Sequence, residues 1–112
     1  MAKRYEVKIT QYAEQSMREI AAYIAVDLIA PEAAVNLMKA FQTEINKLDF
    51  MPERIHLTPE EPWHSLGMRR MVVKNYYVYF LVDEEKDRVQ VTDVTYVKRN
   101  QQKRFGNMPL ES

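Results

Sequence analysis

Apolar residues recur at helical spacing in two neighbouring stretches of the chain. In the first stretch, residues 11–28, they are Ala13, Met17, Ile20, Ala21, Ile24 and Leu28. In the second, which follows Pro31, they are Ala34, Met38, Phe41, Ile45 and Leu48. Each stripe is typical of an amphipathic helix that buries one face, and Thr10 and Pro31 suit the starts of the two helices. The connection is so short that we expect an antiparallel hairpin.

Four other stretches, residues 4–9, 69–73, 76–82 and 88–97, alternate in polarity or are rich in β-branched and aromatic residues. Both features favour strands. In the stretch 76–82 apolar side chains fall on both faces, with Val78, Phe80 and Val82 on one and Tyr77, Tyr79 and Leu81 on the other. A strand of this kind is usually interior, with each face covered. A tight turn is expected at residues 74–75, with positive φ at Asn75.

The predicted order is strand, helix, helix and then three strands, which is typical of a two-layer α+β fold. The helical hairpin would cover one face of the sheet, and the other face, with its tyrosines, is a candidate working surface. Residues 50–66 contain Pro52, Pro59 and Pro62 and are interpreted as an irregular connection. Trp63 within it is expected to plug the edge of the core, and residues 106–112 to form a loose tail.

The composition excludes several classes of site. At 112 residues the chain is expected to form a single domain spanning 1–112. Because it has no cysteine, disulfides, thiolate metal ligands and cysteine nucleophiles are excluded, and two histidines make a structural zinc site a poor interpretation. We expect no metal or other cofactor. No apolar run approaches membrane-spanning length and no signal peptide is visible, so a cytoplasmic protein is expected.

The net charge is zero, but its distribution is uneven. Residues 27–65 hold seven acids and three bases, a net charge of −4, whereas residues 69–104 hold nine bases and five acids, a net charge of +4. Such a bipolar surface could hold an anionic partner on one side. Simple solvation of the charges is the equally acceptable alternative.

Three segments together resemble the RelE/ParE toxin family of bacterial type II toxin–antitoxin systems. They are the helical hairpin (IAAYIA at 20–25, PEAAVNLM at 31–38 and INKLDFMPER at 45–54), the strand pair RRMVVKNYYVYFLVD at 69–83, and VTDVTYVKRN at 91–100. The resemblance extends from about residue 5 to residue 104 and rests on the ordered set of segments. It implies the RelE/ParE-like fold, a helical hairpin packed on one face of a mainly antiparallel four-stranded sheet.

The resemblance also implies a toxin that arrests bacterial growth and is neutralised by a partner antitoxin encoded beside it. RelE-like members cleave mRNA in the ribosomal A site, whereas ParE-like members poison DNA gyrase. The retained basic residues favour ribosome-dependent mRNA cleavage, with mRNA and the ribosome as partners. Gyrase inhibition by protein binding is the alternative, and a non-toxic binding module is the third interpretation.

Metal-free RNA cleavage needs a base, an acid and cations around one phosphate. By resemblance, the candidate catalytic residues are Arg69, Arg70 and Arg99, and proximity in sequence adds Tyr96 as a proton carrier. The candidate RNA-binding residues are Lys74, Tyr77, Lys98, Lys103, Arg104 and Phe105. Two positions depart from the ribonuclease pattern: Tyr77 stands where an arginine is usual, and Phe105 where a tyrosine or histidine is expected. Phenylalanine cannot transfer a proton.

Three further residues can each be interpreted either as catalytic or as ordinary structural or surface residues. His64 and His56 lie in the irregular connection, and no spacing or family pattern favours a catalytic role for either. Glu53 resembles an acidic position used as a base in some family ribonucleases, but it is also an ordinary surface residue after a helix. The stripe 34–48 is interpreted as core rather than as a partner groove.

Overall fold

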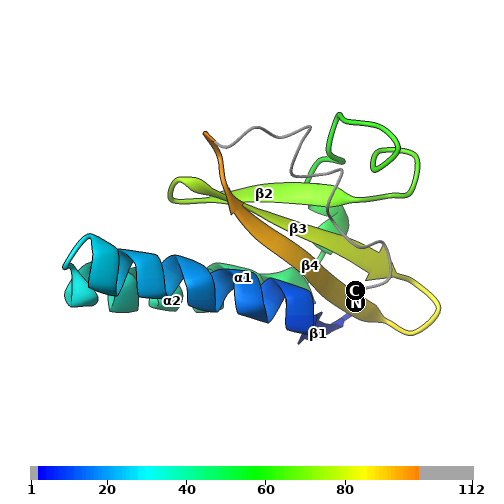
Figure 1. Cartoon of the computed structure of the whole chain (residues 1–112). Helices are drawn as coiled ribbons and strands as arrows, with labels where there is room; N and C mark the ends of the chain where they lie inside the picture. The colour runs from blue at the N-terminus through cyan, green and yellow to red at the C-terminus, as the bar shows by residue number, and fades with distance from the viewer. Residues whose placement is uncertain (1–2, 99–112) are drawn as a thin grey trace.

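The computed structural model describes residues 3–98, which form two layers, a helical hairpin and a twisted sheet (Figure 1). The elements in chain order are β1 (Glu6–Ile9), α1 (Gln11–Ala22), the π-helical turn η1 (Tyr23–Asp27), α2 (Pro31–Asn46), the 3₁₀ turns η2 (Lys47–Asp49) and η3 (Pro52–Arg54), β2 (Arg69–Val73), β3 (Tyr76–Asp83) and β4 (Arg88–Tyr96). This is the predicted α+β fold.

The four strands lie in the order β1-β4-β3-β2. β2, β3 and β4 are antiparallel neighbours, and β1 pairs in parallel with β4, so the sheet is mostly antiparallel. β3 is interior, as its two apolar faces predicted. Thr92 is an extra residue in β4, because Tyr79 pairs with Asp93 while Phe80 pairs with Val91. Such a bulge bends the strand that carries it.

The helical hairpin differs from its prediction in one respect. Thr10 caps α1 as expected, since its hydroxyl accepts a hydrogen bond from the Ala13 N–H at 3.1 Å. The helix predicted to reach residue 28 instead ends as regular α-helix at Ala22 and continues as η1, where the Leu28 N–H donates to the Tyr23 carbonyl at 3.1 Å. The wider turn precedes the chain reversal at Ile29, whose φ is +52°. No helix within residues 3–98 is long and apolar enough to cross a membrane.

The main core lies between the hairpin and the sheet. The predicted stripe of α2 supplies Phe41 and Ile45, and Leu48 follows in η2. Leu37, which the stripe did not include, is also buried. The opposing side chains come from alternate positions of the inner strands, among them Val78, Phe80, Val89, Val91 and Val94.

A second buried cluster lies on the other face of the sheet. Trp63 packs there with Met68 and Tyr79, and only 5% of Trp63 is exposed. The Thr58 N–H donates to the Met68 carbonyl at 2.8 Å, and the Met68 N–H donates to the Trp63 carbonyl at 2.9 Å. Trp63 is therefore buried as predicted, but it covers the far face of the sheet and not the edge of the main core. The tyrosine face, a candidate working surface, is not accessible at Tyr79, which is fully buried under this loop.

The turn between β2 and β3 has the predicted position but a different conformation. Lys74 adopts φ +56°, whereas Asn75, for which positive φ was predicted, does not. Val73 pairs with Tyr76, so residues 74 and 75 form a two-residue turn whose first residue is left-handed.

Candidate functional site

The register of the strands decides which basic residues lie near one another. Arg69 pairs with Phe80 near one end of β3, whereas Tyr96 pairs with Tyr76 at the other end. Four residues of strand separate these two levels, which is about 13 Å. Arg69 and Arg70 therefore lie towards one end of the sheet, while Lys74, Tyr96 and Lys98 lie at the opposite end.

The same residues also lie on different faces of the sheet. Residues paired across strands point to the same face. Tyr96 pairs with Tyr76, which packs edge-on against Phe41 of α2 with 5.5 Å between ring centroids, so Tyr96 belongs to the helix side. Arg70 pairs with Tyr79 of the second cluster and belongs to the opposite side. The structure therefore does not bring Arg70 and Tyr96 together.

Arg69 binds the segment that follows the helical hairpin. Its guanidinium donates to the carbonyls of Glu53 and Ile55, at 3.2 Å and 2.6 Å. Glu53 in turn accepts a hydrogen bond from the Tyr5 hydroxyl at 2.6 Å, and this bond is the main reason that the pKa of Glu53 lies below its ordinary value. Arg69 thus fastens η3 to the start of β2.

Arg70 lies in a half-buried cluster on the face away from the helices. Its guanidinium stacks over the Tyr77 ring at 4.1 Å and approaches the Glu60 carboxylate at 3.5 Å. The Thr58 hydroxyl orients Glu60 through a hydrogen bond of 2.6 Å. Burial holds the pKa of the neighbouring Tyr79 hydroxyl above its ordinary value.

Arg70 and Tyr77 share their face with Val72, of which 63% is exposed. Lys74 lies exposed at the end of the same hairpin. We call Arg70, Val72, Lys74 and Tyr77 the sheet patch. It combines a stacked arginine, an aromatic ring and an exposed aliphatic side chain, and arginine and aromatic residues are enriched among those that dominate protein–protein binding.

The remaining predicted site residues lie near or beyond the end of β4. Tyr96 is partly exposed, and its ring lies 5.5 Å from that of Tyr76. Lys98 is exposed two residues later. The other four, Arg99, Lys103, Arg104 and Phe105, lie outside the described residues.

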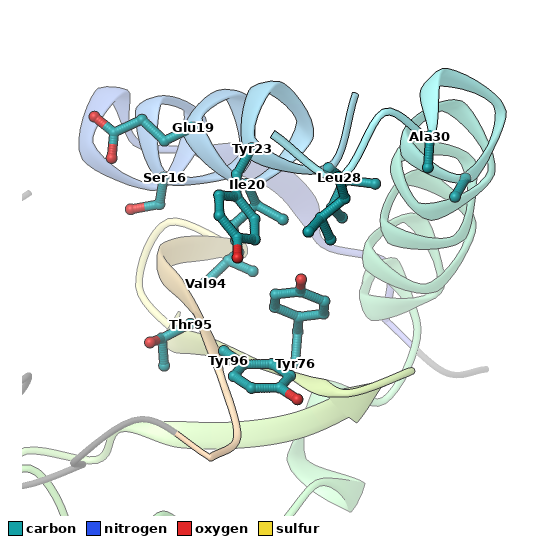
Figure 2. Close-up of a pocket in the computed structure, with 12 residues that line it drawn as sticks. Ser16, Glu19, Ile20, Tyr23, Leu28, Ala30, Tyr76, Val94, Thr95 and Tyr96 are labelled. Carbon is teal, nitrogen blue, oxygen red and sulfur yellow. The ribbon is translucent and has the colours of Figure 1, made fainter. Parts of the chain in front are cut away.

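The chain also forms a groove that the sequence analysis did not predict. It measures about 790 Å³ and separates the outer half of the helical hairpin from the end of β4 (Figure 2). Tyr23 and Leu28 face Tyr76 and Tyr96 across it. We call it the hairpin groove. The sequence did carry a signal for it: six of the seven residues at 23–29 are apolar, with Asp27 as the exception, which is more than one buried helix face requires.

The structure also shows the contacts of His64 and Glu53, for which the sequence allowed both a catalytic and an ordinary role. The His64 ring binds the Thr58 carbonyl through Nδ1 at 3.0 Å, within the loop that covers the second cluster. The Glu53 carboxylate accepts a hydrogen bond from the Tyr5 hydroxyl, and the Glu53 backbone carbonyl accepts one from the Arg69 guanidinium. Within the described chain no three histidine, aspartate or glutamate side chains gather as metal ligands would.

Comparisons with known proteins agree with the fold described above. The family model for the ParE toxin of the type II toxin–antitoxin system parDE matches residues 7–101. A chain of the chromosomal ParDE system of P. aeruginosa superposes with a TM-score of 0.69 at 20% identity, covering 85% of this chain and 98% of that one. No curated protein sequence matches this chain.

Two RelE-type structures have the same fold. The toxin–antitoxin complex RelBE2 of Mycobacterium tuberculosis gives a TM-score of 0.59 at 15% identity, covering 84% of this chain and 92% of that one. A mutant of E. coli toxin RelE in the free state gives a TM-score of 0.59 at 14% identity, covering 90% of each chain. At these identities the similarity concerns the fold alone.

Proposed function

The chain belongs to the ParE toxin family of type II toxin–antitoxin systems, and we propose that it arrests growth by binding DNA gyrase rather than by cleaving mRNA. The toxin class follows from the family. The target is our proposal. The sequence favoured mRNA cleavage with gyrase inhibition as the alternative, and here gyrase inhibition becomes the preferred mechanism. One observation carries it: among the described residues predicted to cleave RNA, Tyr96 lies apart from both Arg69 and Arg70.

A nuclease site needs its groups around one phosphate. An acid or base acts within about 2.6–3.2 Å of the proton that it transfers. Arg70 and Tyr96 lie on opposite faces of the sheet, and Arg69 lies about 13 Å along the sheet from the level of Tyr96. Arg69 also donates to two backbone carbonyls. This separation supports a mechanism without hydrolysis.

The sheet patch is suited to binding a protein. Arg70 is held by Tyr77 on one side and Glu60 on the other, so little side-chain entropy remains to be lost on binding. Val72 beside it offers exposed apolar surface. We therefore propose the sheet patch as the surface that contacts gyrase.

The test is controlled expression of the chain in bacteria, following DNA and protein synthesis separately. We expect DNA synthesis to stop first and the purified chain to inhibit supercoiling by gyrase. The variant Arg70→Ala should weaken inhibition by about tenfold or more, as expected for an arginine that anchors an interface. Arg18→Ala, which removes an exposed helix arginine paired with Glu14, is the matched control and should inhibit normally.

The opposite result would identify mRNA as the target. If protein synthesis stops first while DNA synthesis continues, the gyrase proposal is wrong. The variants to make would then be Arg69→Ala, Arg70→Ala, Tyr96→Phe and Arg99→Ala. Continued growth on expression of the chain would favour the non-toxic binding module.

A further inference from the structure

One end of the molecule carries two exposed surfaces of opposite charge. The helical hairpin reverses direction at this end, and the turn between β2 and β3 lies at the same end (Figure 1). The hairpin groove separates the two surfaces (Figure 2). The acidic loop at residues 83–87 lies at the other end of the sheet, where β3 pairs with the start of β4.

The surface on the helical hairpin is apolar and acidic. Val26, Leu28 and Ile29 are 70%, 55% and 84% exposed, and exposed apolar surface of this kind is typical of an interaction site. Residues 19–38 contain three acids and no base. We call the exposed residues of this turn the hairpin tip; they are Val26, Asp27, Leu28, Ile29 and Glu32.

The surface on the sheet is basic. The Val97 N–H donates to the Asn75 carbonyl at 2.9 Å, which places the end of β4 beside the turn between β2 and β3. Residues 69–82 and 94–98 together contain four bases and no acid. We call the exposed residues at this point the sheet end; they are Lys74, Tyr96 and Lys98.

The charges of these two surfaces are not neutralised within the described chain. Asp27 and Glu32 form no ion pair among residues 3–98, and neither do Lys74 and Lys98. The hairpin tip would be complemented by a basic partner with apolar surface, and the sheet end by an acidic one. Each surface of this chain therefore has the chemistry that the other requires.

The position of the two surfaces allows a second copy to satisfy both at once. Because they lie side by side at one end, a rotation of 180° about an axis between them places each surface opposite its complement. Such a contact is isologous and closes at two copies. We propose that the chain forms a two-fold dimer in which the hairpin tip of each copy contacts the sheet end of the other. This dimer does not depend on the target proposed above.

Sedimentation velocity of the purified full-length chain over a range of concentrations tests the proposal. The parent chain should change from monomer to dimer as its concentration rises. Asp27→Lys and Lys74→Glu should each weaken dimerisation by about tenfold or more, because each change brings like charges together at both contacts of the dimer.

An equal mixture of the two variants supplies the sharper result. Asp27→Lys has a basic tip and a basic sheet end, whereas Lys74→Glu is acidic at both, so the mixture should form a heterodimer although each variant alone is monomeric. Recovery of the heterodimer also shows that both variants are folded.

The loop between β3 and β4 supplies matched controls. Glu85→Lys and Lys86→Glu change exposed residues at the other end of the sheet, and each should dimerise as the parent chain does. Lys86→Glu has the same net charge as Lys74→Glu but keeps a basic sheet end. A mixture of Lys86→Glu with Asp27→Lys should therefore not restore the affinity of the parent dimer.

Four outcomes would overturn the proposal. A chain that stays monomeric at every concentration would leave both surfaces to another protein. A dimer of unchanged affinity in Asp27→Lys and Lys74→Glu would place the contact elsewhere, and its loss on deletion of residues 99–112 would assign it to that segment. Assemblies larger than a dimer would show an open head-to-tail contact. Gyrase takes no part in these measurements, so an error in the gyrase proposal would leave them unaffected.

Discussion

Single residues fasten distant segments of this chain to one another. The Tyr5 hydroxyl, just before β1, lies 2.6 Å from a Glu53 oxygen and 2.8 Å from a Glu84 oxygen. It therefore joins η3 to the loop between β3 and β4. Arg69 reinforces the same region through two backbone carbonyls. None of these partners is close in sequence, so composition and periodicity gave no sign of them.

The contacts of Tyr5 predict how stability depends on pH. The hydrogen bond from Tyr5 holds the pKa of Glu53 below its ordinary value, and the two carboxylates hold the pKa of Tyr5 above its own. Glu53 therefore stabilises the fold above about pH 4.5, its unfolded pKa, and this contribution is lost as pH falls further. Tyr5 contributes fully below about pH 10, and its contribution is lost as pH rises beyond that value.

The variant Tyr5→Phe tests both limbs of this dependence. We expect a lower melting temperature at neutral pH, and smaller falls in melting temperature towards pH 3 and towards pH 11 than in the parent chain. Thermal unfolding monitored by circular dichroism across this range measures the effect. Tyr23→Phe is the control, because Tyr23 is exposed on the hairpin. A parallel downward shift at every pH would show that Tyr5 acts through packing alone.

Among the elements, the connection between η3 and β2 has a larger structural role than its sequence suggested. Its prolines predicted an irregular segment, which it is, but it also carries its own buried cluster. Trp63 closes this cluster over Tyr79, and the segment orients Glu60 towards Arg70. The loop thus lies on the same face as the sheet patch and holds Arg70 through Glu60.

Removal of Trp63 should therefore loosen this loop. Trp63→Ala should lower the free energy of unfolding by about 3–5 kcal/mol, as for other large aromatic residues deleted from a core. Trp63→Phe should cost clearly less. Chemical denaturation measures the free energy, and hydrogen exchange at the Thr58 and Met68 amides should accelerate in Trp63→Ala, because both bond across the loop. A loss below about 1 kcal/mol would contradict this role for Trp63.

At the scale of the whole molecule, the sheet separates the hairpin groove from the sheet patch. The hairpin groove lies between the helical layer and β4, and the sheet patch lies on the far face of β2 and β3. Because the two surfaces lie on opposite sides of the sheet, a molecule bound to one does not need to touch the other.

This separation predicts that a change at the hairpin groove leaves gyrase binding intact. Leu28→Arg, at an exposed position of the groove, should bind gyrase as the parent chain does, whereas Arg70→Ala in the sheet patch should bind it about tenfold or more weakly. Size-exclusion chromatography of each variant with gyrase measures the complex. Loss of the complex in Leu28→Arg but not in Arg70→Ala would contradict the arrangement.

The sequence by itself determined the elements of this protein and most of its core. Helical and strand periodicity are local, so the stripe through Phe41 and Ile45 and the double-faced strand containing Val78 and Phe80 could be read directly. The family could be identified for the same reason, because it is defined by the order of such segments. Even the burial of Trp63 followed from its type and setting.

Only the tertiary structure decided the arrangement of the site. Alternation places Arg69 and Arg70 on opposite faces of any strand, but which face the helices cover depends on packing between segments far apart in sequence. The register of β4 on β3, shifted by the Thr92 bulge, sets where Tyr96 lies relative to both arginines. The hairpin groove likewise exists because α1 and β4 diverge, which is a relation between two elements that neither element's sequence contains.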